Sequence, residues 1–462
     1  MHGTSQRAWL ACRTAGLADA LALLLVHTQA RIQPRSPCRL SSVFRVTGRC
    51  QECSLLGGCI EVARGCIRLL HHARFSSEPA LTIASDASDL ADLVVARPEG
   101  LYCPTGDFYI DPWRPVERAV ITHAHSDHAR FGHRHYLASQ AGANVLLSRL
   151  PGISLQTLAY GERLDLNGTT VSLHPAGHVL GSAQVRIEHR GRVWVASGDY
   201  KLDPDPTCDA FEPVRCDTFI TESTFGLPIY RWDAPQTIFD GVDSWWRHNA
   251  AEGRASVLFC YSFGKAQRVL ASVDAGIGPI FCHGAVEPLN RAYRDAGVQL
   301  PPVRPVSEIP VKDKAAFRQA LIVAPPSAQG SAWLKRFGDY SDAFASGWMR
   351  LRGARRRRGV DRGFVLSDHA DWPSLQTAIQ ATGAERVIVT HGSVEPMVRW
   401  LREQGLEAGA FETQYGDDTV EADAAGADET AATGSVPHEF AQAAERDAST
   451  DDTAAANPSS RV

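Results

Sequence analysis

Short apolar runs alternate with segments of helical spacing between about Leu90 and Gly416. Alternation of this kind is typical of layered α/β folds. The pattern predicts strands at Ala119–Thr122, Thr170–His174, Val193–Ser197, Thr218–Thr221, Ser256–Tyr261, Pro279–Cys282, Leu321–Ala324, Gly363–Leu366 and Val387–Thr390. It predicts helices at Gly264–Ala275, Pro288–Ala296, Trp372–Thr382 and Val394–Gln404. The sequence therefore predicts an α/β fold.

Composition excludes several classes of protein. A net charge of −5 argues against a uniformly basic nucleic-acid coat, although it permits a local basic patch. No apolar run approaches the ~20 residues that a membrane-spanning helix needs, so we expect no membrane partner. An odd count of 11 cysteines in 462 residues does not describe a disulfide framework. Together these features favour a cytoplasmic enzyme.

The two ends of the chain differ in composition from its middle. Residues 1–88 are basic and hold over half of the cysteines, and we expect a poorly ordered extension there. A small zinc site at Cys50, Cys53, Cys59 and Cys66 is the alternative, although the spacing lacks a second CxxC pair. Residues 417–462 hold 11 acidic residues against two arginines and few apolar residues. We expect a disordered acidic tail there.

The strongest chemical signal is a cluster of potential metal ligands at the end of one predicted strand. The apolar run Ala119–Thr122 leads directly into His123, His125, Asp127 and His128. Alternate residues of an extended strand point the same way, so His123 and His125 can reach one metal ion. Imidazole suits zinc, and a carboxylate adds charge for a second ion. This grouping predicts a metal site.

Further polar side chains stand at or near the ends of other predicted strands. They are His178, Asp199, Glu222, His369 and His391. Taken singly, each is more simply a capping or hydrogen-bonded loop residue. Strand ends are where α/β folds place functional groups, so the set as a whole predicts one site.

These motifs resemble those of metallo-β-lactamase-fold hydrolases and their β-CASP nuclease branch. The His123–His128 motif resembles the family signature, and His178 and Asp199 match its next two ligand motifs. The positions of Glu222, His369 and His391 match the three additional motifs of the branch. The overall similarity is to ligase-associated DNA exonucleases, which are relatives of messenger-RNA 3′-end processing factors.

The resemblance implies an αββα sandwich interrupted by an α/β cap. We expect residues 89–225 to form the first part of the core, 226–350 the cap, and 351–416 the second part of the core. The resemblance also implies two Zn²⁺ ions, with Mn²⁺ as the alternative. One zinc ion would bind His123, His125 and His178, and the other would bind Asp127, His128 and His391. Asp199 would bridge the two ions, and Asp111 would orient the histidine loop from behind.

Catalytic roles follow from the same resemblance. His369 is the candidate general acid for the leaving 3′-oxygen, and Glu222 is placed to accept a hydrogen bond from its imidazole. A structural salt bridge is the alternative for Glu222. Asp127 is counted among the catalytic residues as a metal ligand.

Two basic segments are candidate substrate contacts. Lys265 and Arg268 begin a predicted helix after a strand, where a phosphate could bind; an ordinary solvated helix start is an equal alternative. The run Arg355, Arg356, Arg357 and Arg358 precedes His369. Guanidinium groups suit phosphate geometry, so the run can line a substrate channel, and binding should then weaken with salt. A solvated loop is the alternative.

The sequence favours a zinc-dependent DNA exonuclease. The alternatives are a β-CASP ribonuclease, a small-molecule hydrolase of the same core fold, and an inactive scaffold. The long insertion, His369 and the arginine run argue against a small substrate, and the complete ligand set argues against a scaffold. The resemblance implies a role in DNA repair beside an ATP-dependent DNA ligase and a helicase.

Overall fold

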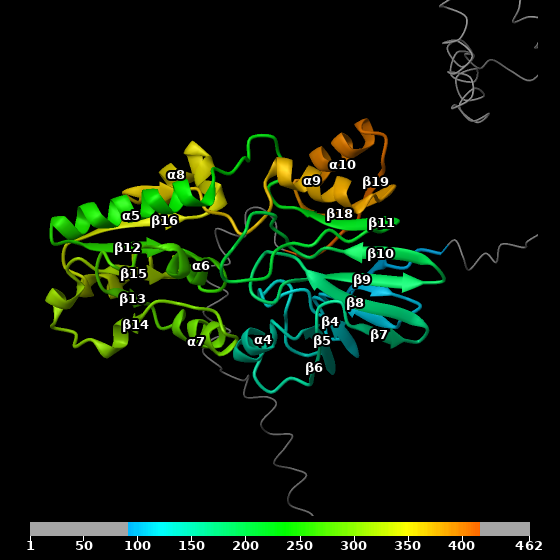
Figure 1. The fold of residues 1–462 in the computed structure, drawn as a ribbon, viewed down its shortest axis with the longest axis horizontal. Coiled ribbons are helices and arrows are strands. Elements are labelled where there is room, and N and C mark those ends of the chain that lie inside the picture. Colours follow the sequence, from blue (N-terminus) through cyan, green and yellow to red (C-terminus); the bar gives the residue numbers. More distant parts are fainter. Residues whose placement is uncertain (1–90, 416–462) are drawn as a thin grey trace, which may run out of the picture. The chain divides into compact units, whose positions relative to one another are not determined.

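The computed structural model describes residues 91–415, so the expected basic extension, the cysteine site within it and the acidic tail lie outside the described residues. The described residues form three sheets with flanking helices, and the predicted α/β class is confirmed (Figure 1). Within this part of the chain, no helix is long and apolar enough to cross a membrane.

Two of the three sheets face each other. The first has the strand order β1-β2-β3-β4-β5-β6. Its strands are β1 (Val95–Arg97), β2 (Gly100–Cys103), β3 (Phe108–Ile110), β4 (Arg118–Val120), β5 (His135–Ser139) and β6 (Leu155–Leu158). The second has the order β19-β18-β11-β10-β9-β8-β7. Its strands are β7 (Arg163–Leu166), β8 (Thr169–Pro175), β9 (Ala183–His189), β10 (Arg192–Ala196), β11 (Thr218–Ser223), β18 (Arg386–Gly392) and β19 (Glu407–Ala410).

A hydrophobic core fills the space between these two sheets. Val120 and Leu137 of the first sheet pack in one cluster with Val185, Trp194 and other apolar residues of the second. Helices α9 (Trp372–Thr382) and α10 (Val394–Glu403) cover the other face of the second sheet. Helix α4 (Ala143–Arg149) covers the other face of the first. The layers therefore run helix, sheet, sheet, helix.

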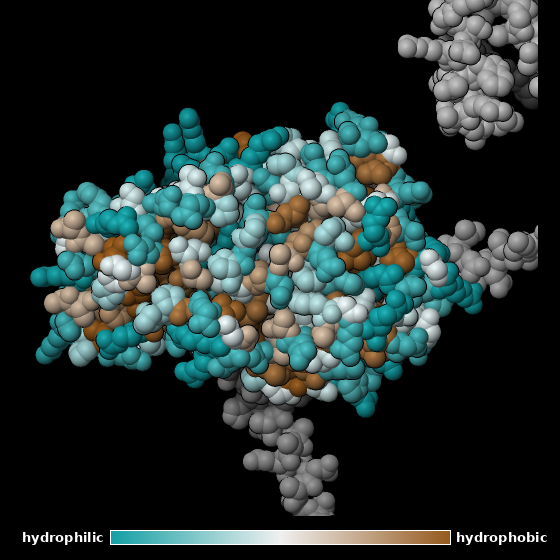
Figure 2. Space-filling view, in the orientation of Figure 1, coloured by the Kyte–Doolittle hydropathy of each residue, from teal (hydrophilic) through white to brown (hydrophobic). Residues whose placement is uncertain are grey.

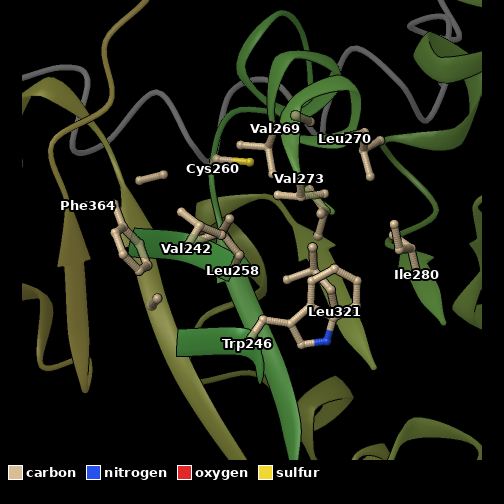
Figure 3. Close-up of a cluster of buried hydrophobic side chains, with 14 of the residues drawn as sticks. Val242, Trp246, Leu258, Cys260, Val269, Leu270, Val273, Ile280, Leu321 and Phe364 are labelled. Atoms are coloured by element: carbon tan, nitrogen blue, oxygen red, sulfur yellow. The ribbon is translucent and has the colours of Figure 1, made fainter. Parts of the chain in front are cut away.

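The third sheet is wholly parallel and has the order β14-β13-β15-β12-β16-β17. Its strands are β12 (Ala255–Phe259), β13 (Ile280–Cys282), β14 (Arg304–Pro305), β15 (Leu321–Ala324), β16 (Tyr340–Ala345) and β17 (Arg362–Phe364). Helices α5 (Pro235–Ala251) and α6 (Lys265–Ser272) pack on one face, where Trp246, Val269 and Leu321 join one apolar cluster (Figure 3). Short 3-10 turns cover the other face, at Val306–Glu308, Lys314–Phe317, Pro326–Ala328, Ala332–Arg336 and Gly347–Arg350.

The inserted sheet extends beyond the expected boundary at residue 350. Helix α8 (Arg352–Arg358) leads into β17, which pairs with β16 from Ala343↔Arg362 to Ala345↔Phe364. The chain therefore returns to the two facing sheets only after Phe364. The inserted unit also contacts helix α4, which covers the first sheet. Leu289 and Tyr293 of α7 (Glu287–Asp295) pack with Leu146 of α4.

All nine predicted strands and four predicted helices are confirmed, with shifts at their ends. Helix α5 was not predicted, although its buried residues Phe239, Val242, Trp245 and Trp246 recur at helical spacing after a proline at its start. Strands β1, β2, β3, β5 and β6 of the first sheet were not predicted either, because strands of about three to five residues show too little alternation to recognise.

Candidate metal centre

The predicted site residues gather where strands of the two facing sheets end. His123 follows β4, His178 follows β8, and Asp199 follows β10, while His391 lies at the end of β18. His369 lies in the loop between β17 and α9. Because each strand ends at the same edge of the sandwich, side chains that are distant in sequence meet there.

Asp199 lies at the centre of the cluster and contacts both predicted groups of ligands. Its Oδ2 atom lies 3.4 Å from Nε2 of His123 and 3.8 Å from Nε2 of His178. Ligand atoms of His123, His125, His178 and Asp199 lie within 4.8 Å of one another. These four residues are therefore close enough to share one ion.

The second group lies on the other side of Asp199. Its Oδ2 atom is 3.4 Å from Nε2 of His128, and its Oδ1 atom is 3.1 Å from Nε2 of His391. Asp127 approaches the same place, since its Oδ2 atom lies 3.5 Å from Nε2 of His128. The Asp127 side chain remains 38% exposed, so it faces the open side of the cluster.

Threonine and aspartate side chains hold the outward ring nitrogens of three histidines. Nδ1 of His123 lies 3.0 Å from the Thr122 hydroxyl, which donates to Asp111, and Nδ1 of His128 lies 2.8 Å from Oδ2 of Asp111. Nδ1 of His391 lies 2.9 Å from the hydroxyl of Thr390. The partners of His123 and His128 accept from Nδ1, and Nε2 of each of the three rings faces Asp199.

Backbone carbonyl groups hold the outward ring nitrogens of the other two histidines. Nδ1 of His178 lies 2.8 Å from the carbonyl oxygen of Asp368, and Nε2 of His125 lies 3.5 Å from that of Phe263. A carbonyl oxygen can only accept, so Nε2 of His178 and Nδ1 of His125 present lone pairs to each other at 3.0 Å. Facing lone pairs repel unless a cation lies between them.

Two further buried ring nitrogens also indicate that a cation binds here. Nε2 of His123 and Nε2 of His128 are buried without any hydrogen-bond partner. Such atoms cost free energy unless something binds them. Five imidazoles around a buried carboxylate are a donor set that suits zinc. The residues therefore fit a metal centre.

The pKa shifts of His125 and His178 agree with this donor set, whereas that of His128 runs in the opposite direction. Burial lowers the pKa of His125 to about 3 and that of His178 to about 4, which keeps both rings in the neutral form that binds metals. Burial also lowers the pKa of His128, but Asp199, Asp127 and Asp111 outweigh it and raise that pKa well above its usual value. The carboxylates around His128 therefore attract positive charge to this position.

Asp111 has a backbone conformation that few residues adopt. Its φ is +43°, and its side chain accepts hydrogen bonds from the Thr122 amide at 2.7 Å and the Thr122 hydroxyl at 2.5 Å. A positive φ is better tolerated by aspartate than by most residues. Gly198 packs closely against Thr122, because a Cβ atom at position 198 would lie only 2.7 Å from Cβ of Thr122.

Glu222 and His369 form a buried pair beside the metal ligands. Oε2 of Glu222 lies 3.1 Å from Nδ1 of His369, and Oε1 accepts a 2.8 Å hydrogen bond from the amide of Tyr200. Burial raises the pKa of Glu222, but His369 outweighs this and lowers it, so the carboxylate is ionised. Nδ1 of His369 also lies 4.0 Å from Oδ2 of Asp199, at the margin of the cluster.

Lys265 and Arg268, predicted to contact substrate, are buried inside the protein. Their side chains are 3% and 2% exposed. Lys265 pairs with Asp368 at 3.0 Å, and Arg268 pairs with Asp205 at 3.3 Å and with Asp368 at 3.4 Å. Carboxylates of the protein therefore match both charges, which argues against the expected phosphate contact.

The arginine run forms the short helix α8 rather than a loop. Arg355, Arg356 and Arg357 are exposed, but Arg355 donates to the carbonyl of Met349, and the half-buried Arg358 lies over the ring of Phe344 at 4.2 Å. The surface over α8 is largely hydrophilic (Figure 2). Arg356 and Arg357 are thus the members of the run most open to a ligand.

Three residues of this site were not recognised in the sequence. Thr122 and Thr390 each precede a histidine of the cluster, and a repeated Thr-His pair at a strand end was a signal that could have found them. Asp368 immediately precedes His369, but its contacts with His178 and Lys265 come from distant segments, so no local pattern indicates them.

No protein-family model matches the chain. The chain is 33% identical to the "Probable DNA ligase" of Opitutus terrae over 316 residues, covering 68% of this chain and 30% of that ligase. It is 26% identical to cleavage and polyadenylation specificity factor 73 of Drosophila melanogaster over 277 residues, covering 54% of this chain and 38% of that protein. It is 28% identical to endoribonuclease YSH1 of Saccharomyces cerevisiae over 124 residues, covering 26% of this chain and 15% of that protein.

The chain thus spans well under half the length of these relatives. At this modest identity, the similarity to these relatives supports an assignment to the β-CASP family of nucleases.

Proposed function

We propose that this protein is a zinc-dependent exonuclease that hydrolyses phosphodiester bonds in DNA. The observation that carries the proposal is the convergence of five inward-facing imidazoles on Asp199, directly beside the Glu222–His369 pair. A metal site next to a separate acid–base pair suits hydrolysis, whereas a structural zinc site has no use for that pair. In this proposal the layered core is a metallo-β-lactamase sandwich and the third sheet is its β-CASP cap.

The ligands divide between two zinc ions, and Mn²⁺ is the alternative metal. His123, His125 and His178 would hold one ion, Asp127, His128 and His391 would hold the other, and Asp199 would contact both. Bound zinc ions would lower the pKa of a water molecule and neutralise charge on the phosphoryl oxygens. Asp111 fixes the orientation of His128 through Nδ1.

The protein's own acid–base group is His369. As the oxygen of a water molecule bonds to phosphorus, His369 donates a proton to the leaving 3′-oxygen, and the P–O3′ bond breaks to leave a 3′-hydroxyl and a 5′-phosphate. The ionised Glu222 at 3.1 Å favours the protonated imidazolium and keeps Nδ1 occupied. Such proton transfer contributes about 10²–10⁴ in rate.

Arg355–Arg358 supply the phosphate contacts in this proposal, chiefly through Arg356 and Arg357. Helix α8, which carries these arginines, precedes β17 of the inserted sheet. The chain continues from β17 into the loop that carries His369. Guanidinium groups bind phosphate with paired hydrogen bonds, so a nucleic-acid backbone could pass from α8 toward the metal centre.

Similarity to a protein named a DNA ligase supports DNA as the substrate. The proposal includes a role in DNA repair in the cytoplasm, in which this enzyme acts with an ATP-dependent DNA ligase and a helicase. The second candidate is an RNA-processing ribonuclease, which the endoribonuclease names of other relatives favour.

Degradation of matched end-labelled substrates tests the proposal. Single- and double-stranded DNA and RNA of one sequence are incubated with the purified protein and added zinc or manganese. Stepwise shortening of DNA is expected. Cleavage of RNA alone would favour the ribonuclease, and no cleavage of any of the four would refute the nuclease function.

A further inference from the structure

A buried network of four charged side chains joins three distant segments beside the metal centre. Asp368 lies in the His369 loop, Lys265 and Arg268 lie on α6 of the inserted unit, and Asp205 follows Asp199. The side chains of Lys265, Arg268, Asp205 and Asp368 are 2–4% exposed. Two cations and two carboxylates balance one another, as burial of charge requires.

Both cations act on the residues just before His369. Lys265 contacts Oδ2 of Asp368 at 3.0 Å, and Arg268 contacts Oδ1 at 3.4 Å. Arg268 also donates a 2.6 Å hydrogen bond to the carbonyl oxygen of Ser367. Asp205 holds Arg268 from the other side at 3.3 Å. The backbone of residues 367–368 is therefore anchored to α6.

The anchored backbone in turn contacts a metal-site histidine. The carbonyl oxygen of Asp368 accepts a 2.8 Å hydrogen bond from Nδ1 of His178, which leaves Nε2 of that ring directed at the cluster. The hydroxyl of Ser367 accepts from the amide of His369 at 3.1 Å. Displacement of this segment would turn one proposed ligand and the proposed general acid together.

The start of α6 also packs closely on the loop that carries His178. Gly264 has φ +82°, and a Cβ atom there would overlap the side chain of Val179. Only glycine fits this position without displacing the neighbouring loop. The close packing and the ion network thus fix α6 against both segments.

We infer that Lys265 and Arg268 are positioning residues, which act through Asp368 to orient His178 and His369. The inference replaces the phosphate contact expected of these two residues, and its catalytic part rests on the proposed nuclease function. Neither side chain touches the reacting groups, so loss of either should alter the geometry of the centre and leave affinity for the nucleic acid unchanged.

The test compares Lys265→Met and Arg268→Met with the charge-preserving variants Lys265→Arg and Arg268→Lys. Zinc affinity is measured by competition with a chromogenic chelator, and kcat, KM and the salt dependence of KM are measured on end-labelled DNA. We expect each methionine variant to bind zinc about 10-fold more weakly, as for other residues that orient a ligand from behind. We also expect kcat to fall and KM to stay unchanged, with partial recovery in the charge-preserving variants.

Two results would overturn the inference. A raised KM with a weakened salt dependence and normal zinc affinity would make these residues substrate contacts. A lowered Tm with normal zinc affinity and normal kcat would make the network merely structural. If Arg268→Met does not fold, Lys265→Met still decides, because Asp368 then keeps its contact with Arg268. Wild-type protein without activity on any nucleic acid would refute the proposed function, whereas the zinc comparison would still test the positioning role.

Discussion

The carboxylate of Glu222 lies 3.1 Å from Nδ1 of His369, and the two side chains are 0% and 11% exposed. The pair adjoins the metal cluster, since Asp199, Glu222 and His369 have ligand atoms within 4.8 Å of one another. A histidine that an ionised carboxylate orients beside a metal site is suited to donate a proton. The first prediction depends on this relationship.

The variant His369→Ala should retain its zinc but lose turnover by about 10²–10⁴-fold, because only the proton donor is removed. Zinc content and single-turnover rates on end-labelled DNA measure the two effects. His174→Ala is the matched control, since His174 lies on β8 and pairs with Ser172. Loss of zinc from His369→Ala would show that this histidine is a ligand instead.

The variant Asp199→Asn should lose zinc and activity together. Asp199 is the one carboxylate that contacts both ligand groups, at 3.4 Å from His123 and 3.1 Å from His391. An amide keeps the shape but removes the charge, so we expect an activity loss beyond the ~10–100-fold that outer residues cause. Metal analysis after dialysis measures the stoichiometry, with the exposed Asp165→Asn as control. Full zinc content in Asp199→Asn would contradict a bridging position.

Neutralising the exposed arginines of α8 should weaken nucleic-acid binding. The double variant Arg356→Gln/Arg357→Gln removes two phosphate contacts, so binding should weaken most at low salt and the salt dependence should become shallower. Fluorescence anisotropy across a salt series measures both quantities. Arg399→Gln removes an arginine that is 82% exposed on α10, and it should leave the slope unchanged. An unaltered slope in the double variant would remove α8 from the substrate path.

Asp368 should make stability depend on acid pH. Burial raises the pKa of this carboxyl, but Lys265 and Arg268 outweigh burial and hold the pKa well below the ordinary value of 3.8. Its stabilising contribution is therefore complete above about pH 4 and is lost as pH falls toward the folded-state pKa.

The variant Asp368→Asn should lower the free energy of unfolding by about 3–5 kcal/mol at neutral pH, because buried cations lose their partner. Part of the dependence of the free energy of unfolding on acid pH should also disappear in this variant. Urea unfolding at several pH values measures both effects. Asp339→Asn, which breaks the pair of a 76% exposed carboxylate with Arg254, should cost less than about 1 kcal/mol. Equal costs in the two variants would contradict a structural role for the buried network.

The sequence predicted the layered class and the members of the histidine cluster, because both leave local patterns. Apolar runs end at His123 and His391, and helical spacing identifies α9 from Trp372 to Thr382. Contacts between distant segments leave no such pattern. Nothing near Lys265 in the sequence indicates Asp368 as its partner, so an exposed phosphate site and a buried ion pair looked equally suitable there.

The extent of the inserted sheet leaves no local pattern either. The run of arginines was predicted to line a substrate channel, with a solvated loop as the alternative; it forms α8 and leads into β17, whose pairing with β16 lies outside any local window. Asp111 shows the opposite case. Its place after an apolar stretch and its resemblance to the family's supporting aspartate suggested support for the histidine loop, and Asp111 lies 2.8 Å from Nδ1 of His128.

Zinc titration of metal-free protein tests the central claim most directly. The protein is stripped with a chelator, zinc is added stepwise, and the rate of nucleotide release from end-labelled single-stranded DNA is followed at each addition. A metal-dependent nuclease with the proposed ligands should be inactive without metal and reach full rate as two zinc ions bind per chain. Full activity in the metal-free protein, or zinc binding at both positions without any nucleotide release, would contradict it.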